Sequence, residues 1–187
     1  MTATVLLLLA LGAGSGATDA LRTRAEEIRQ ALPPPGEQMS PSTREKIEGL
    51  VTRTIDLRAM LQSALGPRWN TMTEKQRKRL LAAFESRFKQ ASSGDLDPYR
   101  STQIEYRQEK PAGDGAVDVP TRVVIKGEPT EITYTMRPEK DAWRIIDITI
   151  DGISTVANYR TSFARVIAKD GVEGLITRLE RRTASKS

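Results

Sequence analysis

Hydrophobic positions in the first half of the chain recur with the period of an α-helix. Residues 19–32 form a charge-rich helical segment that ends at the run Pro33-Pro34-Pro35-Gly36, through which no helix continues. The apolar stripes that follow change phase near Thr54–Asp56, so we expect a kink or break there. The predicted helical zone covers residues 19–92, and its stripes are Ile47, Leu50, Val51 and Ile55, then Leu57, Met60, Leu61, Ala64 and Leu65, and then Leu80, Leu81, Phe84 and Phe88.

Short local patterns mark where these helices begin and end. Ser42 with Glu45, and Thr73 with Gln76, have the spacing of a capping box, in which the two side chains satisfy free backbone N–H groups at a helix start. Gly66-Pro67 is expected to end the second stripe, because glycine readily adopts the left-handed conformation that closes a helix.

Between residues 99 and 151 the apolar period changes from 3.6 to 2, which is typical of strands. Turn-forming residues at Pro111–Gly115, Gly127–Pro129 and Pro138–Asp141 separate four segments. Because the connections are short, we expect an antiparallel meander of about four strands. The apolar residues that share a parity are Ile104 and Tyr106, then Val117, Val119, Val123 and Ile125, then Ile132, Tyr134 and Met136, and then Ile146, Ile148 and Ile150.

A helical pattern returns in residues 154–182. One apolar face contains Val156, Tyr159 and Phe163, and Asp170 with Glu173 is expected to cap a last helix. The sequence therefore predicts an α+β domain in which helices cover one face of a curved antiparallel sheet.

The first residues are predicted to lie outside this domain. Thr4–Ala13 is an apolar run of ten residues, and Ser15 and Ala17 provide the small side chains of a cleavage site. The run is too short to span a bilayer as a helix. No Lys or Arg precedes it, and a buried N-terminal helix is the alternative interpretation. We expect residues 1–17 to be a secretory signal peptide cleaved near Ala17, and residues 18–187 to form one exported domain.

Composition then narrows the chemistry. The 187 residues include no Cys and no His, so thiol nucleophiles, disulfides, imidazole bases and the usual zinc sites are excluded. We expect no cofactor and no metal. Asp147 and Asp151 share a strand face, but about four residues of strand separate their Cα atoms by ~13 Å, too far for a paired-carboxylate site. Tyr134 and Tyr159 are possible proton donors for which the sequence places no base nearby.

Because the composition excludes much of the chemistry used in catalysis, we next consider binding functions. The net charge of +5 is mild, and with 5% aromatic residues the chain has few platforms for stacking nucleic-acid bases. We therefore expect no nucleic-acid partner, and we interpret the basic residues around Lys75–Arg79 as a solvated helix face or as a weak contact for anionic membranes or an acidic protein. The broad apolar faces are consistent either with a solid core or with a hollow interior that binds an apolar ligand.

Two blocks of residues, in matching order, resemble one known family, the MlaC-type proteins. These are the periplasmic phospholipid-binding components of toluene-tolerance, MCE-associated ABC transport systems. The C-terminal block comprises Trp143, Asp147, Asp151, Gly152, Ser154, Asn158, Tyr159, Arg160, Phe163, Gly171, Leu175 and Leu179, and the upstream block comprises Asp56, Leu57, Ala59, Met60, Leu65, Gly66, Trp69, Thr73, Gln76, Arg77, Phe84 and Tyr99.

The resemblance implies an NTF2-like fold whose sheet and helices enclose a deep apolar pocket for acyl chains. It also implies a periplasmic carrier without covalent chemistry, which would exchange glycerophospholipid with a membrane-bound MCE-domain ABC transporter complex and with an outer-membrane partner. From the helical stripes and one sheet parity, the candidate pocket residues are Leu57, Met60, Leu61, Leu65, Trp69, Phe84, Phe88, Val123, Ile125, Tyr134, Met136, Ile146, Ile148, Tyr159, Phe163 and Val166.

Two alternatives to a carrier stay open at this stage. An NTF2-like hydrolase or isomerase would need two titratable groups converging in the pocket. An exported adaptor would have a solid core and would bind an acidic partner through its basic helices.

Overall fold

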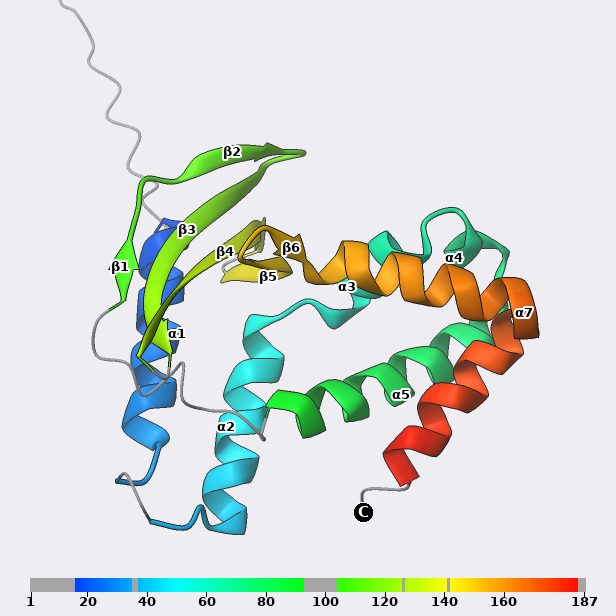
Figure 1. Cartoon of the computed structure of the whole chain (residues 1–187), viewed down its shortest axis with the longest axis horizontal. Helices are drawn as coiled ribbons and strands as arrows, with labels where there is room; N and C mark the ends of the chain where they lie inside the picture. The colour runs from blue at the N-terminus through cyan, green and yellow to red at the C-terminus, as the bar shows by residue number, and fades with distance from the viewer. Residues whose placement is uncertain (1–15, 35–36, 93–103, 126, 141, 185–187) are drawn as a thin grey trace, which may run out of the picture.

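The computed structural model describes residues 16–34, 37–92, 104–125, 127–140 and 142–184, in which helices pack against a curved antiparallel sheet (Figure 1). The predicted α+β class is confirmed. Fifteen of the seventeen residues of the expected signal peptide lie outside the described residues. In the described part of the chain, no helix has the length and apolar character needed to cross a bilayer. The helices are α1 (Ala17–Ala31), α2 (Pro41–Thr54), α3 (Leu57–Leu65), α4 (Arg68–Thr71), α5 (Glu74–Ser92) and α7 (Thr155–Ala184).

Local capping explains most of the helix boundaries. The Thr73–Gln76 capping box is confirmed: the Thr73 N–H donates to Gln76 Oε1 at 2.9 Å, and the Gln76 N–H donates to Thr73 Oγ1 at 3.2 Å. The box predicted for Ser42 is wrong, because Ser40 caps α2 by accepting from the N–H of Thr43 at 3.1 Å. Proline fits the first helical position, where its missing N–H costs nothing, so the cap lies before Pro41.

The break expected near Thr54–Asp56 is also present, and it joins the helices to the sheet. Ile55 ends α2 in an extended conformation and forms a parallel bridge with Ile145. The Asp56 N–H donates to the Ile145 carbonyl at 2.9 Å, while Asp56 Oδ1 accepts from the N–H of Ala59 at 2.8 Å and so caps α3. The change of apolar phase in the sequence therefore marks the point where the chain touches the sheet.

The sheet contains six strands in the described region rather than about four. The strand order is β1-β3-β4-β5-β6, and β2 also pairs with β3. The two short strands that periodicity missed are β2, which overlaps the expected break at Pro111–Gly115, and β6, which leads into α7. The strands are β1 (Glu105–Tyr106), β2 (Lys110–Gly113), β3 (Ala116–Ile125), β4 (Glu128–Glu139), β5 (Ala142–Ile150) and β6 (Ile153–Ser154).

The pairing of β4 with β5 is interrupted by one additional residue in β5. Thr135 pairs with Asp147, but the next residue of β4, Met136, pairs with Ile145, so Ile146 has no partner of its own. Such a β-bulge reverses the side-chain alternation of the strand beyond it. Ile148 and Ile150 share a face as expected, opposite Tyr134 and Ile132, whereas the prediction is wrong for Ile146.

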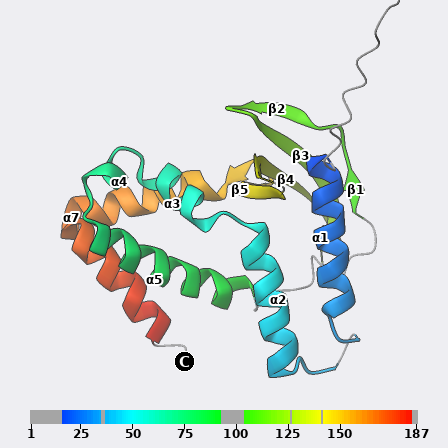
Figure 2. The same ribbon diagram turned by 180° about the vertical axis from the view of Figure 1, so that it is seen from behind.

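The apolar interior continues from the sheet into the helices. Helices α3, α5 and α7 enclose a filled core in which the rings of Phe84, Tyr159 and Phe163 touch, with centroids 5.1–6.4 Å apart. α7 bends at Gly171, whose φ of 70° interrupts the helix next to the predicted cap at Asp170. Figures 1 and 2 show α1, α2 and the sheet on one side of the molecule, and α4 with the bend of α7 on the opposite side.

Candidate functional site

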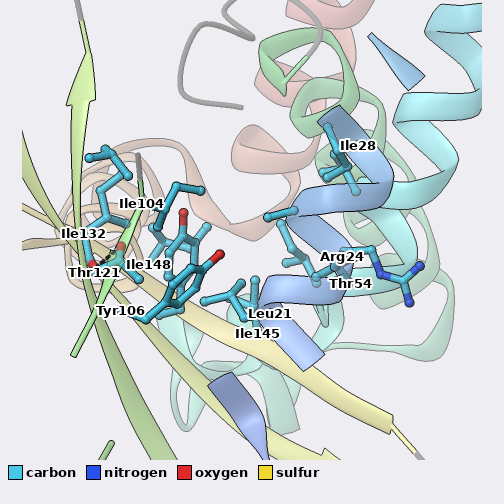
Figure 3. Close-up of a pocket in the computed structure, with 15 residues that line it drawn as sticks. Leu21, Arg24, Ile28, Thr54, Ile104, Tyr106, Thr121, Ile132, Ile145 and Ile148 are labelled. Atoms are coloured by element: carbon cyan, nitrogen blue, oxygen red, sulfur yellow. Dashed lines mark hydrogen bonds between the residues drawn. The ribbon is translucent and has the colours of Figure 1, made fainter. Parts of the chain in front are cut away.

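An apolar cavity lies between the first two helices and the sheet. α1, α2 and the residue that ends α2 form one wall, and Ile104 with β1, β3, β4 and β5 forms the other (Figure 3). The lining residues are Leu21, Arg24, Ala25, Ile28, Val51, Thr54, Ile55, Ile104, Tyr106, Thr121, Val123, Ile132, Tyr134, Ile145 and Ile148.

Three of the polar side chains that line this cavity have polar partners of their own. The buried hydroxyl of Thr54 donates to the Leu50 carbonyl at 2.8 Å, and that of Thr121 donates to the Ile132 carbonyl at 2.8 Å. Arg24 forms an ion pair with Glu27, and its guanidinium points away from the sheet (Figure 3). No buried side-chain nitrogen or oxygen in the described residues lacks a hydrogen-bond partner. Apart from the phenol groups of Tyr106 and Tyr134, the cavity surface is therefore largely apolar.

Tyr106 is the side chain of the cavity whose ionisation the structure shifts. Its half-buried phenol has a raised pKa because burial disfavours the phenolate; the nearby Arg22 guanidinium opposes this rise, and Glu26 adds to it. The Arg22 guanidinium lies 4.8 Å from the centre of the Tyr106 ring, a cation–π distance. At neutral pH this side of the cavity consequently presents an uncharged ring beneath an exposed cation.

The first turn of α1 is hydrogen-bonded to the connection between β1 and β2. The backbone N–H and the hydroxyl of Thr18 both donate to Glu109 Oε1 at 2.7 Å. Below that turn, Leu21 and Ile28 are the buried apolar residues that face the cavity. The cavity volume is about 50 Å³, whereas sites for small organic ligands generally enclose about 300–1,000 Å³. A ligand of that size therefore requires the cavity to widen.

The structure places only three of the sequence-predicted pocket residues on this cavity: Val123, Tyr134 and Ile148. The candidates from the helical stripes lie instead in the filled core formed by α3, α5 and α7, or pack against it. Leu65 and Phe163 also border a separate surface hollow between α3, α4 and α7. The helical candidates are Leu57, Met60, Leu61, Leu65, Trp69, Phe84, Phe88, Tyr159, Phe163 and Val166.

The remaining sheet candidates also lie off the cavity, each for a local reason. Met136 is 1% exposed and belongs to the filled core. Ile146 is the additional residue of the bulge, so its neighbours Ile145 and Ile148 face the cavity in its place. Ile125 ends β3 beside the hairpin and is not among the lining residues.

Sequence reasoning missed the wall that α1 and α2 contribute. A signal was present, because Leu21, Ala25 and Ile28 follow one another at i, i+4 and i+7 on one face of α1. The surrounding charges made residues 19–32 look like a solvated helix. On the sheet, Thr121 and Ile132 share the parity of Val123 and Tyr134 and line the same space.

Carboxylates do not gather at the cavity. No Asp or Glu is among its lining residues. Asp147, a candidate from the sequence, is engaged at the start of α7: its Oδ1 accepts from the N–H of Ile148 at 2.8 Å and from the N–H of Val156 at 3.0 Å, and its Oδ2 accepts from the Ser154 hydroxyl. Among the described residues, no group of three or more Asp or Glu side chains is placed to hold a metal ion.

The fold and the cavity together define an α+β protein with an apolar space between its first helices and its sheet. The family model described as MlaC protein matches residues 25–181, so the chain belongs to the MlaC family. Among solved structures, the chain is similar to the phospholipid-binding protein from Ralstonia solanacearum, which was determined in complex with a phospholipid. The two are 26% identical, the TM-score is 0.72, and the match covers 90% of this chain and 94% of that one. No curated protein sequence matches the chain.

Proposed function

We propose that this protein is a periplasmic carrier that binds a glycerophospholipid with its acyl chains in the cavity between α1, α2 and the sheet. In this function the protein does no covalent chemistry; it takes up a lipid, shields the chains from water and releases them elsewhere. The observation that carries the proposal is the similar fold of a family relative's structure, which holds a phospholipid, combined with an apolar cavity in this chain.

The lining of the cavity supports an acyl chain as the ligand. The hydroxyls of Thr54 and Thr121 donate to backbone carbonyls, so a methylene chain entering the cavity leaves neither of them newly unpaired. Each methylene group removed from water contributes about 0.8 kcal/mol. The driving force for burying long chains is therefore ample even if widening the cavity costs several contacts.

Widening is a necessary part of the proposed cycle. A cavity of about 50 Å³ is too small for acyl chains, and α1 is one of its walls. We infer that α1 moves away from the sheet as the acyl chains enter, with Leu21 and Ile28 exchanging contacts with the sheet for contacts with lipid. The headgroup would then stay at the rim, near the exposed guanidinium of Arg22.

The same lining weighs against the enzyme alternative. Its titratable side chains are Arg24, Tyr106 and Tyr134, and no carboxylate lies among them to act as a base. The adaptor alternative required a solid interior, whereas the space under α1 is hollow. We therefore favour lipid carriage over both.

The remaining parts of the proposal follow the family. We propose export through a signal peptide that ends near Ala17, action in the periplasm, and lipid exchange with a membrane-bound MCE-domain ABC transporter complex on one side and an outer-membrane partner on the other. The family match over residues 25–181 supports these assignments.

Native purification tests the proposal directly. The mature protein would be isolated without detergent and extracted with organic solvent, and phospholipid would be quantified by mass spectrometry against protein. We expect lipid in a fixed ratio near one molecule or a few per chain, and uptake of labelled phospholipid from vesicles by delipidated protein. A chain that carries no lipid and takes none up would contradict the proposed function.

A further inference from the structure

One row of side chains runs across the sheet from the cavity to the solvent. Thr121 pairs with Ile132, Ile132 pairs with Ile150, and Ile150 pairs with Ile153. Directly opposed residues of antiparallel strands lie on the same face of a sheet. Since Thr121 and Ile132 line the cavity, the whole row belongs to the cavity-facing side.

Exposure rises along this row. Thr121 is 1% exposed and Ile132 is 5% exposed, whereas Ile150 is 45% and Ile153 is 68% exposed. The row therefore begins inside the cavity and ends in water without an intervening polar side chain.

Exposed large apolar residues are few in the described part of the chain. Only Val124, Ile150 and Ile153 qualify, and two of these three are directly paired neighbours. Val124 follows the cavity-lining Val123 along β3, so its side chain lies on the other face of the strand. An apolar pair that continues the lining of a cavity is typical of a binding surface, while a single exposed valine needs no explanation.

The backbone holds the exposed pair in place. Asp151 and Gly152 connect β5 to β6 with φ values of 47° and 81°, the left-handed conformation of a tight hairpin turn. The Asp151 N–H donates to the Glu131 carbonyl at 2.9 Å, and the Glu131 N–H donates to Asp151 Oδ1 at 3.0 Å. The turn is thereby tied to β4, and Ile150 and Ile153 form a fixed apolar surface rather than a mobile loop.

We propose that Ile150 and Ile153 form a portal through which the acyl chains of a phospholipid pass into and out of the cavity. This inference rests on the proposed function. A chain that slides along the row keeps apolar contact at every step, from Ile153 to Ile132, and so avoids full exposure to water. An acyl chain is favoured over an apolar protein segment as the occupant because the surface is continuous with the cavity lining.

The test separates the rate of transfer from the capacity to bind. The variant Ile150→Thr/Ile153→Thr keeps the β-branched shape that strands favour and removes apolar surface at the portal. Val124→Thr is the matched control, because Val124 is 46% exposed but lies on the opposite face. Protein loaded with a fluorescent phosphatidylglycerol is mixed with vesicles of phosphatidylethanolamine and phosphatidylglycerol, and the transfer rate is followed by stopped-flow fluorescence.

We expect the double variant to retain a wild-type amount of lipid and to transfer it roughly twenty-five-fold more slowly, about fivefold for each lost apolar contact in the transition state. The control should transfer at the wild-type rate. Equal rates in the double variant and the control, with lipid still bound, would overturn the portal. A wild-type protein that binds no lipid would instead overturn the proposed function. If the double variant does not fold, the transfer rate of the single variant Ile153→Thr tests the portal instead, since that side chain is the most exposed of the row.

Discussion

Enlarging Ala25 tests whether the space under α1 is the lipid site. Ala25 is partly buried and lines the cavity from the helix side. The change Ala25→Leu directs additional carbon atoms into the closed cavity, where they fill space in the unloaded protein and compete with acyl chains in the loaded one. Stability and lipid retention should therefore change in opposite directions.

The size of both effects can be worked from the structure. Leucine adds about three carbon groups, each worth ~0.8 kcal/mol when fully buried. Because Ala25 is only partly buried, about half of this total, ~1 kcal/mol, is expected for the delipidated protein. In a chain of this length, that gain raises Tm by about 2–4 °C. Lipid retention should fall roughly tenfold, which corresponds to a typical overpacking cost of ~1.4 kcal/mol.

Calorimetry and lipid quantification on one preparation check both effects. Thr23→Leu is the control, because it places a leucine on the exposed side of the same helix and should change neither quantity by much. If the Ala25→Leu protein melts at the wild-type temperature and retains the wild-type amount of lipid, then the cavity is not the binding site and the packing argument is wrong.

Three further predictions concern the anchors of the two halves of the molecule. Glu109→Ala removes both hydrogen bonds to Thr18, so amide exchange in the first turn of α1 should accelerate about tenfold or more. Labelled lipid should also exchange faster. Unchanged protection of this turn in hydrogen-exchange mass spectrometry would contradict the role of these hydrogen bonds as an anchor. Phe163→Ala should lower the free energy of unfolding by about 3–5 kcal/mol in denaturant titrations, with unchanged lipid per folded chain, because Phe163 packs in the filled core and not on the cavity. Arg79 donates two hydrogen bonds to Glu180 and lowers the pKa of that carboxyl below its ordinary value of 4.5. The pair therefore stabilises the fold above pH 4.5, and this contribution is lost as the pH falls through the lowered pKa. Arg79→Met should flatten the acid side of a plot of Tm against pH, and a curve identical to that of the wild type would refute the assignment.

Helix boundaries were the part of the fold most accessible from the sequence. The break at Thr54–Asp56 could be predicted because the apolar phase changes there, and the phase changes because the chain leaves one helix to touch the sheet at Ile145. The Thr73–Gln76 cap could also be predicted from the sequence, since both partners lie within one helical turn. Signals of this kind are local, and the structure preserves them.

The position of the cavity was not accessible in the same way. Periodicity shows which face of a helix is apolar, but it does not show whether the facing side chains fill the space between them. Broad stripes with Phe84 and Phe163 suggested a pocket wall, yet these rings pack edge to face within the core formed by α3, α5 and α7. The cavity under α1 is lined on the helix side by the smaller residues Leu21, Ala25 and Ile28. A cavity remains where the side chains on facing helices and strands are too small to touch. A single sequence does not give the distance between those elements.

The additional residue in β5, Ile146, shifts the alternation of inward and outward side chains between the two halves of that strand. Ahead of Ile146, Ile145 lines the cavity; beyond it, Ile148 lines the same cavity. The two residues are three positions apart, and the inserted residue allows both to face the same side of the sheet. Deleting Ile146 would place Ile145, Asp147 and Ile148 opposite Met136, Thr135 and Tyr134 in an unbroken register, so Ile148 would still face the cavity and only the local bulge would be lost. Either length of the strand keeps Ile145 and Ile148 on the same face of the sheet, because both pair with residues of one parity in β4.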